Sequence, residues 1–202
     1  MSNNAHDLTA LLGSRICHDL ISPLGAIGNG LELLSMTGSG GAEMALIAES
    51  VANANARVRF YRVAYGAAAG DHSMGRSEIA SILEDVTRGS RTRIAWNSPE
   101  PALRAEVKLA FLLIQCLETA MPYGGEIVVT RDGPAWSIHG RAEKLKILPQ
   151  LWQGLQEEAA AAPGLPEITP AQVQFALAPQ TMRALGRTPR LQIRETDILL
   201  GY

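Results

Sequence analysis

The first 70 residues carry two apolar stripes at helical spacing. The first stripe recurs at alternating intervals of three and four residues, at Leu20, Leu24, Ile27, Leu31 and Leu34. The second has the same alternation, at Met44, Ile47, Val51, Ala54, Val58, Tyr61 and Tyr65. Such spacing predicts helices that pack along their length against other helices. The glycine-rich segment 37–41 between them cannot continue a helix, so the pattern predicts a helical hairpin.

A two-helix hairpin leaves part of each apolar stripe uncovered. A second copy of the hairpin across a twofold axis would cover both stripes and complete a four-helix bundle. Packing of the hairpin against the rest of the same chain is the alternative. We favour the homodimer.

After residue 75 the pattern changes to that of a mixed α/β domain. The small and polar residues 66–75 are interpreted as a linker. Helices are predicted over 77–87, 102–123, 144–162 and 169–185, and strands over 91–96, 126–130, 135–139, 191–196 and 198–200. Ser77 and Thr169 are the expected N-cap residues, and Pro170 suits the first position of a helix. The predicted fold class is therefore α + α/β, with a helical hairpin over 1–70 and an α/β domain over 76–202.

Composition and charge narrow the function classes. The chain has 202 residues, of which 47% are hydrophobic and 19% charged, so it can bury a core. Its net charge of −2 offers no basic excess for a nucleic acid or a membrane surface. Cys17 and Cys116 lack metal-ligand spacing, which argues against a zinc finger or a disulfide scaffold. The apolar run 109–114 is far shorter than the roughly 20 residues that span a bilayer, and the polar N-terminus shows no signal peptide. We expect a cytoplasmic protein.

The segment around His18 carries the candidate chemistry. Cys17, His18 and Asp19 are adjacent, but neighbouring side chains on a helix diverge by roughly 100°, which argues against a catalytic triad. Cys17 continues the apolar stripe three residues before Leu20, so we expect it in the core.

His18 lies off the apolar stripe. Its neighbours on the same helix face are Arg15, Ser22, Gly25 and Asn29, which are small or polar apart from the arginine. An imidazole exposed above such a strip is open to a docking partner, although a surface histidine without a function would have the same surroundings. This face has no second histidine or carboxylate at metal-ligand spacing, which argues against a metal site.

Pro23 follows His18 by little more than one helical turn. A proline inside a helix costs roughly 3 kcal/mol, because it removes a hydrogen bond and clashes with the carbonyl four residues earlier. That carbonyl belongs to Asp19. We therefore expect a helix kink at Pro23, close to where a partner would approach His18.

Residues 18–24, with the sequence His-Asp-Leu-Ile-Ser-Pro-Leu, resemble the H-box of the dimerisation and phosphotransfer domain of bacterial histidine kinases. The resemblance implies that His18 is the phospho-acceptor and that Asp19 orients its imidazole. It also implies that Pro23 is the kink and that two hairpins form a dimeric four-helix bundle.

The second domain resembles the ATP-binding domain of those kinases in its order of elements, but it lacks their nucleotide motifs. Residues 113–125 resemble the N-box helix, yet its metal-binding asparagines fall on Gln115 and Thr119, and Thr119 has no amide carbonyl for Mg²⁺. Pro122 stands where the family usually has lysine or arginine. The adenine-contacting Asp-x-Gly-x-Gly, the glycine-rich lid and a Walker-type loop are missing from the sequence. We therefore expect no ATP binding.

The whole chain resembles the ChpT-type histidine phosphotransferases, whose second domain is a degenerate version of the kinase fold. The resemblance implies a two-component phosphorelay, in which His18 takes a phosphoryl group from one receiver aspartate and passes it to another. It implies no cofactor bound by this chain, with Mg²⁺ supplied by the receiver partner. The implied donor is the receiver domain of a CckA-like hybrid histidine kinase. The implied acceptors are CtrA-like and CpdR-like response regulators of the cell cycle.

We expect five residues to form the receiver-docking surface: Arg15, Ile21, Ser22, Gly25 and Asn29. Arg57, Arg59 and Arg62 could bind phosphate, but a solvated arginine-rich helix face is the simpler interpretation. Two alternatives stay open. A divergent sensor histidine kinase would bind ATP, and a non-catalytic dimeric scaffold would not need His18. The acidic charge balance disfavours a DNA-binding regulator.

Overall fold

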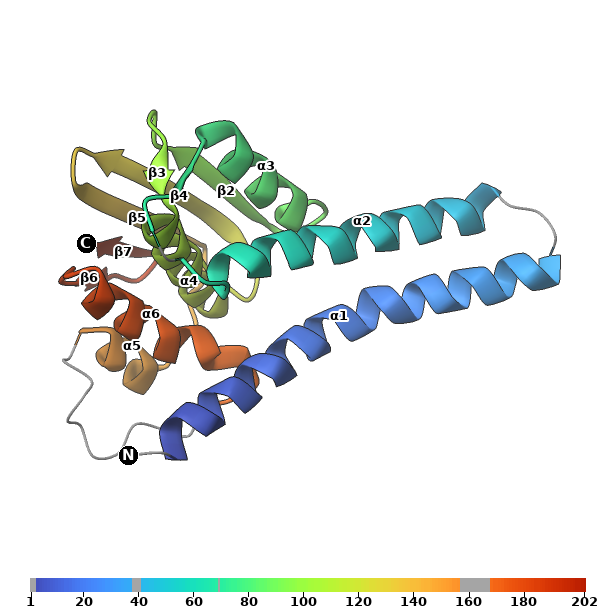
Figure 1. Cartoon of the computed structure of the whole chain (residues 1–202), viewed down its shortest axis with the longest axis horizontal. Helices are drawn as coiled ribbons and strands as arrows, with labels where there is room; N and C mark the ends of the chain where they lie inside the picture. Colours follow the sequence, from blue (N-terminus) through green and yellow to red (C-terminus); the bar gives the residue numbers. More distant parts are fainter. Residues whose placement is uncertain (1–2, 38–40, 69, 157–167) are drawn as a thin grey trace.

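The computed structural model describes residues 3–37, 41–68, 70–156 and 168–202 (Figure 1). Two long antiparallel helices, α1 (Asn3–Thr37) and α2 (Gly41–Ala64), form a hairpin that projects from an α/β domain. The predicted hairpin and the predicted α/β domain are both confirmed. None of the helices in the described part of the chain is long and apolar enough to cross a membrane.

The α/β domain contains, within the described residues, a five-stranded mixed sheet in the order β2-β4-β5-β7-β6. Its strands are β2 (Thr92–Asn97), β4 (Gly125–Asp132), β5 (Ala135–Arg141), β6 (Arg190–Ile193) and β7 (Asp197–Gly201). β2 and β4 run parallel, and the other neighbours are antiparallel. Two short strands, β1 (Ser73–Met74) and β3 (Ala102–Leu103), pair separately. The helices are α3 (Arg76–Thr87), α4 (Arg104–Ala120), α5 (Pro149–Gln156) and α6 (Val173–Ala184), the last preceded by the 3₁₀ turn η1 (Pro170–Gln172).

One face of the sheet is buried beneath the helices. Its register aligns Trp96 with Val129, Val129 with Ile138, and Ile138 with Leu200, so that a row of buried apolar side chains crosses four strands. Side chains alternate along each strand, and the intervening positions are polar or partly exposed. This alternation is typical of a sheet covered on one face, and it explains why the strands were predictable from their sequence.

The core is continuous from the sheet into the hairpin. α4 is apolar on nearly all sides and buries every residue from Leu109 to Leu117. Phe111 of α4 stacks on Phe60 of α2 at 4.8 Å between ring centroids and meets Trp96 of the sheet edge-on at 6.4 Å. Burying each such side chain contributes roughly 1.5–3 kcal/mol. The last turns of α2 therefore pack against the α/β domain and share its core.

The structure corrects the expected starts of three helices. Ser77 is not an N-cap, because α3 begins at Arg76 and Gly75 precedes it in extended conformation. Residues 102–103 form β3 rather than helix, because they pair with β1. The helix expected from residue 144 begins only at Pro149, since a proline suits the first helical position and disfavours helix in the residue before it. Residues 157–162 of that expected helix lie outside the described residues.

Two glycines of α1 provide a matched test of the hairpin packing. A Cβ at Gly30 would lie 2.6 Å from Cγ1 of Ile47 on α2, whereas a Cβ at Gly25 would meet nothing within 4 Å. Gly25→Ala should raise the free energy of unfolding by about 1 kcal/mol through helix propensity. Gly30→Ala should lower the free energy of unfolding by about 1 kcal/mol, because the clash with Ile47 outweighs the gain in helix propensity. Urea unfolding followed by circular dichroism measures both, and equal stabilisation by the two variants would contradict the close approach of the helices.

Candidate functional site

His18 and Asp19 lie side by side on α1 but in different environments. The His18 side chain is 86% exposed, whereas that of Asp19 is only 10% exposed. The two meet through a hydrogen bond between Nδ1 of His18 and Oδ1 of Asp19 at 3.0 Å. The structure therefore brings together the two residues that the sequence singled out, with the imidazole facing outward and the carboxylate facing inward.

The Asp19 carboxylate is the hub of the site. Its Oδ2 forms an ion pair with Nε of Arg15, one turn earlier on α1, at 2.8 Å. The same oxygen accepts a hydrogen bond from the hydroxyl of Tyr61 on α2. A guanidinium nitrogen of Arg57, also on α2, lies 3.9 Å away. One carboxylate thus joins both helices of the hairpin.

These contacts fix the charge of Asp19. Burial alone would raise the pKa of this carboxyl, but the hydrogen bonds from Tyr61 and His18 and the charges of Arg15 and Arg57 outweigh it, and the pKa is lowered. An ionised carboxylate can only accept hydrogen bonds. In the neutral imidazole of His18 the shared proton therefore belongs to Nδ1, and Nε2 is the nitrogen with a free lone pair.

Tyr61 is a site residue that the sequence reasoning missed. It was expected only as part of the apolar stripe, although a buried tyrosine must find a partner for its hydroxyl. Burial, followed by the bond to Asp19, raises the pKa of Tyr61 to about 12, so the hydroxyl stays protonated and donates. Its ring packs on Tyr65 at 5.1 Å, and the Tyr65 hydroxyl donates to Oε1 of Gln115 on α4 at 2.6 Å.

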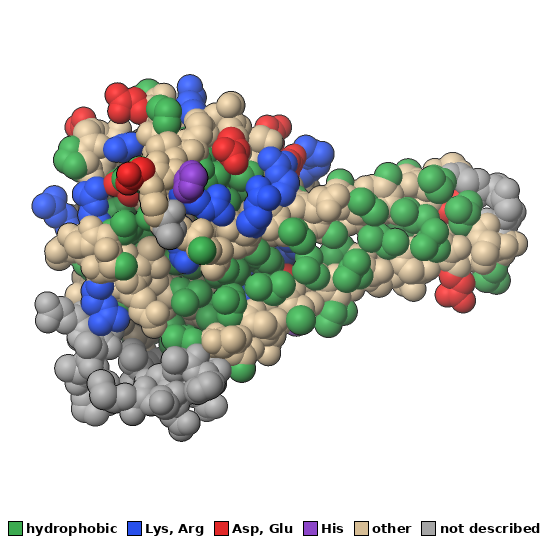
Figure 2. All heavy atoms as spheres, in the orientation of Figure 1, with side chains coloured by type: hydrophobic (Ala, Val, Ile, Leu, Met, Phe, Trp, Pro, Cys, Tyr) green, Lys and Arg blue, Asp and Glu red, His purple; other side chains and the backbone are tan. Residues whose placement is uncertain are grey.

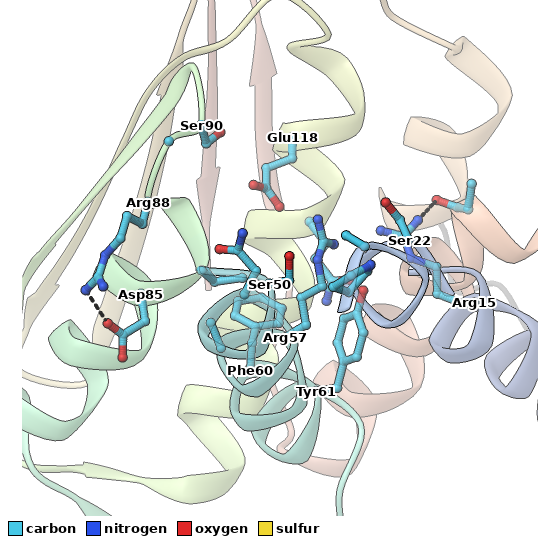
Figure 3. Close-up of a pocket in the computed structure, with 18 of the residues that line it drawn as sticks. Arg15, Ser22, Ser50, Arg57, Phe60, Tyr61, Asp85, Arg88, Ser90 and Glu118 are labelled. Atoms are coloured by element: carbon cyan, nitrogen blue, oxygen red, sulfur yellow. Dashed lines mark hydrogen bonds and ion pairs between the residues drawn. The ribbon is translucent and has the colours of Figure 1, made fainter. Parts of the chain in front are cut away.

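A cavity of about 820 Å³ opens beside the hub, between the hairpin and the α/β domain (Figure 3). Polar and charged side chains from α1, α2, α4 and the segment after α3 line it. The Glu118 side chain points into this cavity from α4 (Figure 3). Burial raises the pKa of Glu118 to about 7, although the nearby Arg15 and Arg57 oppose the shift.

The expected docking residues divide into two groups. Ile21, Ser22, Gly25 and Asn29 are exposed along α1, and Ser22 also lines the cavity. Arg15 is different, because its guanidinium is held by Asp19 and donates to the backbone carbonyl of Ala171 at 3.2 Å. It lies beneath the hub rather than on an open surface.

Four other residues discussed from the sequence also have defined places. Arg59 is paired with Asp85 at 2.7 Å, and Arg62 is exposed. Cys17 is exposed, so the expectation that it lies in the core is wrong. It continues the part of the α1 stripe that α2 does not cover. Pro23 is buried inside α1, which is helical through that position, and a kink there stays a prediction.

The side chains at the two positions that match the N-box asparagines form hydrogen bonds with other groups of the fold. Gln115 is buried and accepts from Tyr65, while its amide donates to the carbonyl of Phe111 at 3.4 Å. Thr119 donates to the carbonyl of Gln115 and accepts from the amide of Gln174 on α6, both at 2.9 Å. Across the described residues there is no group of three or more His, Cys, Asp or Glu side chains that could hold a metal ion.

Comparisons with known proteins show which family this chain resembles. Residues 76–197 match the family described as the histidine phosphotransferase C-terminal domain. The protein phosphotransferase ChpT of Brucella abortus (strain 2308) is 36% identical over 169 residues, which cover 81% of this chain and 79% of the relative. A solved structure of a bacterial phosphotransferase aligns over 100% of this chain and 98% of its own, with 32% identity and a TM-score of 0.80. The histidine kinase AdeS of Acinetobacter baumannii aligns with 10% identity over 91% of this chain and 95% of its own, at a TM-score of 0.44.

Glu118 predicts a pH dependence of stability. The native state holds the Glu118 proton up to about pH 7, whereas the unfolded chain releases it near its ordinary pKa of 4.5. Stability is therefore lost as the pH rises through this window. Glu118→Gln should be more stable than the wild type by about 2 kcal/mol at pH 8.5, and nearly equal to it at pH 4.5.

Urea unfolding at a series of pH values measures the difference. Glu84→Gln, which changes an exposed carboxylate on α3, is the control. The same pH trend in both variants, or none in Glu118→Gln, would contradict the assignment.

Proposed function

This chain belongs to the histidine phosphotransferases, protein phosphotransferases that act as intermediates of two-component phosphorelays, and we propose that His18 is the residue that carries the phosphoryl group. The observation that supports this is the pairing of an exposed imidazole with a largely buried carboxylate that holds its Nδ1. The other ring nitrogen is then the nucleophile that a receiver can approach.

The proposed transfer needs no proton to move. The lone pair on Nε2 of His18 attacks the phosphorus of a receiver's aspartyl phosphate, the bond from phosphorus to the aspartyl oxygen breaks, and the receiver carboxylate leaves. The phosphorylated imidazole carries a positive charge, which the ionised Asp19 stabilises through the Nδ1 proton. In the second transfer an aspartate oxygen of another receiver attacks the phosphorus, and neutral His18 is the leaving group.

We further propose that this chain works without ATP and without a metal of its own. Gln115 and Thr119 use their polar atoms in hydrogen bonds to Tyr65, Phe111 and Gln174, which supports a fold that has given up nucleotide binding. Phosphoryl transfer depends chiefly on positioning and on neutralising the phosphate charge. The receiver would supply Mg²⁺ and most of that neutralisation.

The receiver would dock on the exposed strip of α1 that runs past His18. Ser22, Gly25 and Asn29 have small side chains, so the backbone of a partner can approach closely, and Ile21 offers an exposed apolar contact. Arg15 is better placed to hold Asp19 than to meet the receiver. From the resemblance to ChpT we propose a CckA-like hybrid kinase as the donor in the cytoplasm, and CtrA-like and CpdR-like regulators as the acceptors.

The hairpin also supports the proposal of a homodimer. Large apolar side chains stay exposed at intervals of seven residues, Leu24 and Leu31 on α1 and Met44, Val51 and Val58 on α2. Figure 2 shows hydrophobic side chains following both helices along one face of the hairpin. Exposed apolar surface of this extent is typical of an interface, and a second hairpin would cover it as the sequence pattern predicts.

The central test is transfer from a phosphorylated receiver. Wild-type protein should take up ³²P from a receiver labelled on its aspartate, and His18→Ala should fall to background because the nucleophile is gone. His139→Ala is the matched control, since His139 pairs with Asp197 at 3.1 Å on the sheet, and it should label like the wild type. Incubation with labelled ATP alone should leave every variant unlabelled.

Other results would support the alternatives. Labelling by ATP without a receiver would indicate a divergent sensor kinase. Wild-type protein that takes no label from a panel of receivers would favour a dimeric scaffold.

The dimer is tested by charging the apolar face. In light scattering, Leu31→Glu should shift the protein from twice the chain mass of 21.6 kDa to the monomer mass. In the dimer the new carboxylate would be buried against the second copy of the hairpin, which costs free energy. Met36→Glu changes another exposed apolar residue of α1, but on the side that carries His18, and should stay dimeric. Monomeric wild-type protein would contradict the proposal.

A further inference from the structure

Tyr61 and His18 contact opposite oxygens of one carboxylate. The Tyr61 hydroxyl donates to Oδ2 of Asp19, and Nδ1 of His18 meets Oδ1 at 3.0 Å. Rotation of the carboxyl group would break both contacts together. The orientation of the exposed imidazole therefore depends on what holds Oδ2.

The Tyr61 hydroxyl is itself held firmly. Tyr61 is 8% exposed, and its ring lies edge-on to Phe60 at 6.0 Å and packs on Tyr65 at 5.1 Å. Phe60 in turn stacks on Phe111 of α4. The core thus holds the Tyr61 hydroxyl in place against the Asp19 carboxylate, which also contacts the exposed His18.

Two arginines can hold the Asp19 carboxylate if the Tyr61 hydroxyl is removed. Arg57 lies 3.9 Å from Oδ2, on an exposed part of α2, and Arg15 pairs with the same oxygen through a flexible side chain. Without the Tyr61 hydroxyl, the two arginines are free to draw the carboxylate away from His18. The imidazole would then lose the acceptor that keeps its proton on Nδ1.

We propose that Tyr61 is a positioning residue for phosphotransfer, which fixes the Asp19 carboxylate so that Nε2 of His18 is kept unprotonated and aimed at the receiver. The inference rests on the proposed role of His18. Tyr61 touches no reacting atom and acts through Asp19. A tyrosine that merely stabilised the hairpin would have no effect on the tautomer of His18.

The test compares two variants that each remove one hydroxyl from neighbouring, packed rings. Tyr61→Phe loses the bond to Asp19 and keeps the aromatic packing. Tyr65→Phe loses the bond to Gln115 and leaves Asp19 untouched. Nitrogen-15 NMR of labelled histidine reports the tautomer, with the His18 signals assigned by their absence in His18→Ala. Rapid-quench transfer from a phosphorylated receiver reports the rate at saturating receiver.

We expect Tyr61→Phe to lose the excess of the Nδ1–H tautomer and to slow the transfer step about tenfold, as expected for the loss of a hydrogen bond to a charged group. The affinity for the receiver should not change. Tyr65→Phe should match the wild type in tautomer and in rate. An unchanged tautomer and rate in Tyr61→Phe, or equal losses in both variants, would overturn the inference.

A double substitution separates positioning from stability. In an Asp19→Asn background Tyr61→Phe should cause no further loss of rate, because the group through which it acts has been changed. A purely structural role would lower the rate in both backgrounds and would show in thermal unfolding. If wild-type His18 accepts no phosphoryl group, the proposed function fails, while the tautomer measurement still decides the role of Tyr61.

Discussion

The arrangement of the site depends on a carboxylate that is charged and almost out of solvent. Asp19 has a side chain only 10% exposed, and a charge in such a place must be paired and hydrogen-bonded to be tolerated. Arg15 and Arg57 supply positive charge, and Tyr61 supplies a hydrogen bond from the second helix. These contacts tie the two helices together at the level of His18. In the proposed transfer, they also set the tautomer of the exposed ring.

The same site is joined to the α/β domain. Arg15 reaches the carbonyl of Ala171, just before α6, and Tyr65 beside Tyr61 reaches Gln115 of α4. Phe60 and Phe111 stack across the junction of the hairpin and the domain. The second domain therefore has a structural part in the site. The helix α4, which resembles the N-box helix in sequence, packs against the hairpin that carries the histidine.

Several features were accessible from the sequence because they rest on local rules. Helical spacing predicted the hairpin, and strict alternation predicted β4 and β5 with their turn. Adjacent His18 and Asp19 followed by Pro23 singled out the candidate site. Local rules also failed in places. The helix expected from residue 144 starts at Pro149, where the proline itself was the overlooked signal.

What the sequence determined by itself is the helical hairpin and the main strands of the sheet, the chemical identity of the candidate histidine and its acidic neighbour, and the absence of nucleotide motifs. Each of these follows from spacing or residue type within a few positions. The short strands β1 and β3 were not predicted. Only the tertiary structure decided that Tyr61, 42 residues from Asp19, completes the hub, and that Cys17 is exposed rather than in the core. A stripe of apolar residues shows which face of a helix is able to pack against a neighbour. It does not show which part of that face a given neighbour buries. The burial of each side chain is decided by how α1 packs on α2 and how α2 packs on α4. There the free energy gained by burying large side chains outweighs the local preferences of the sequence.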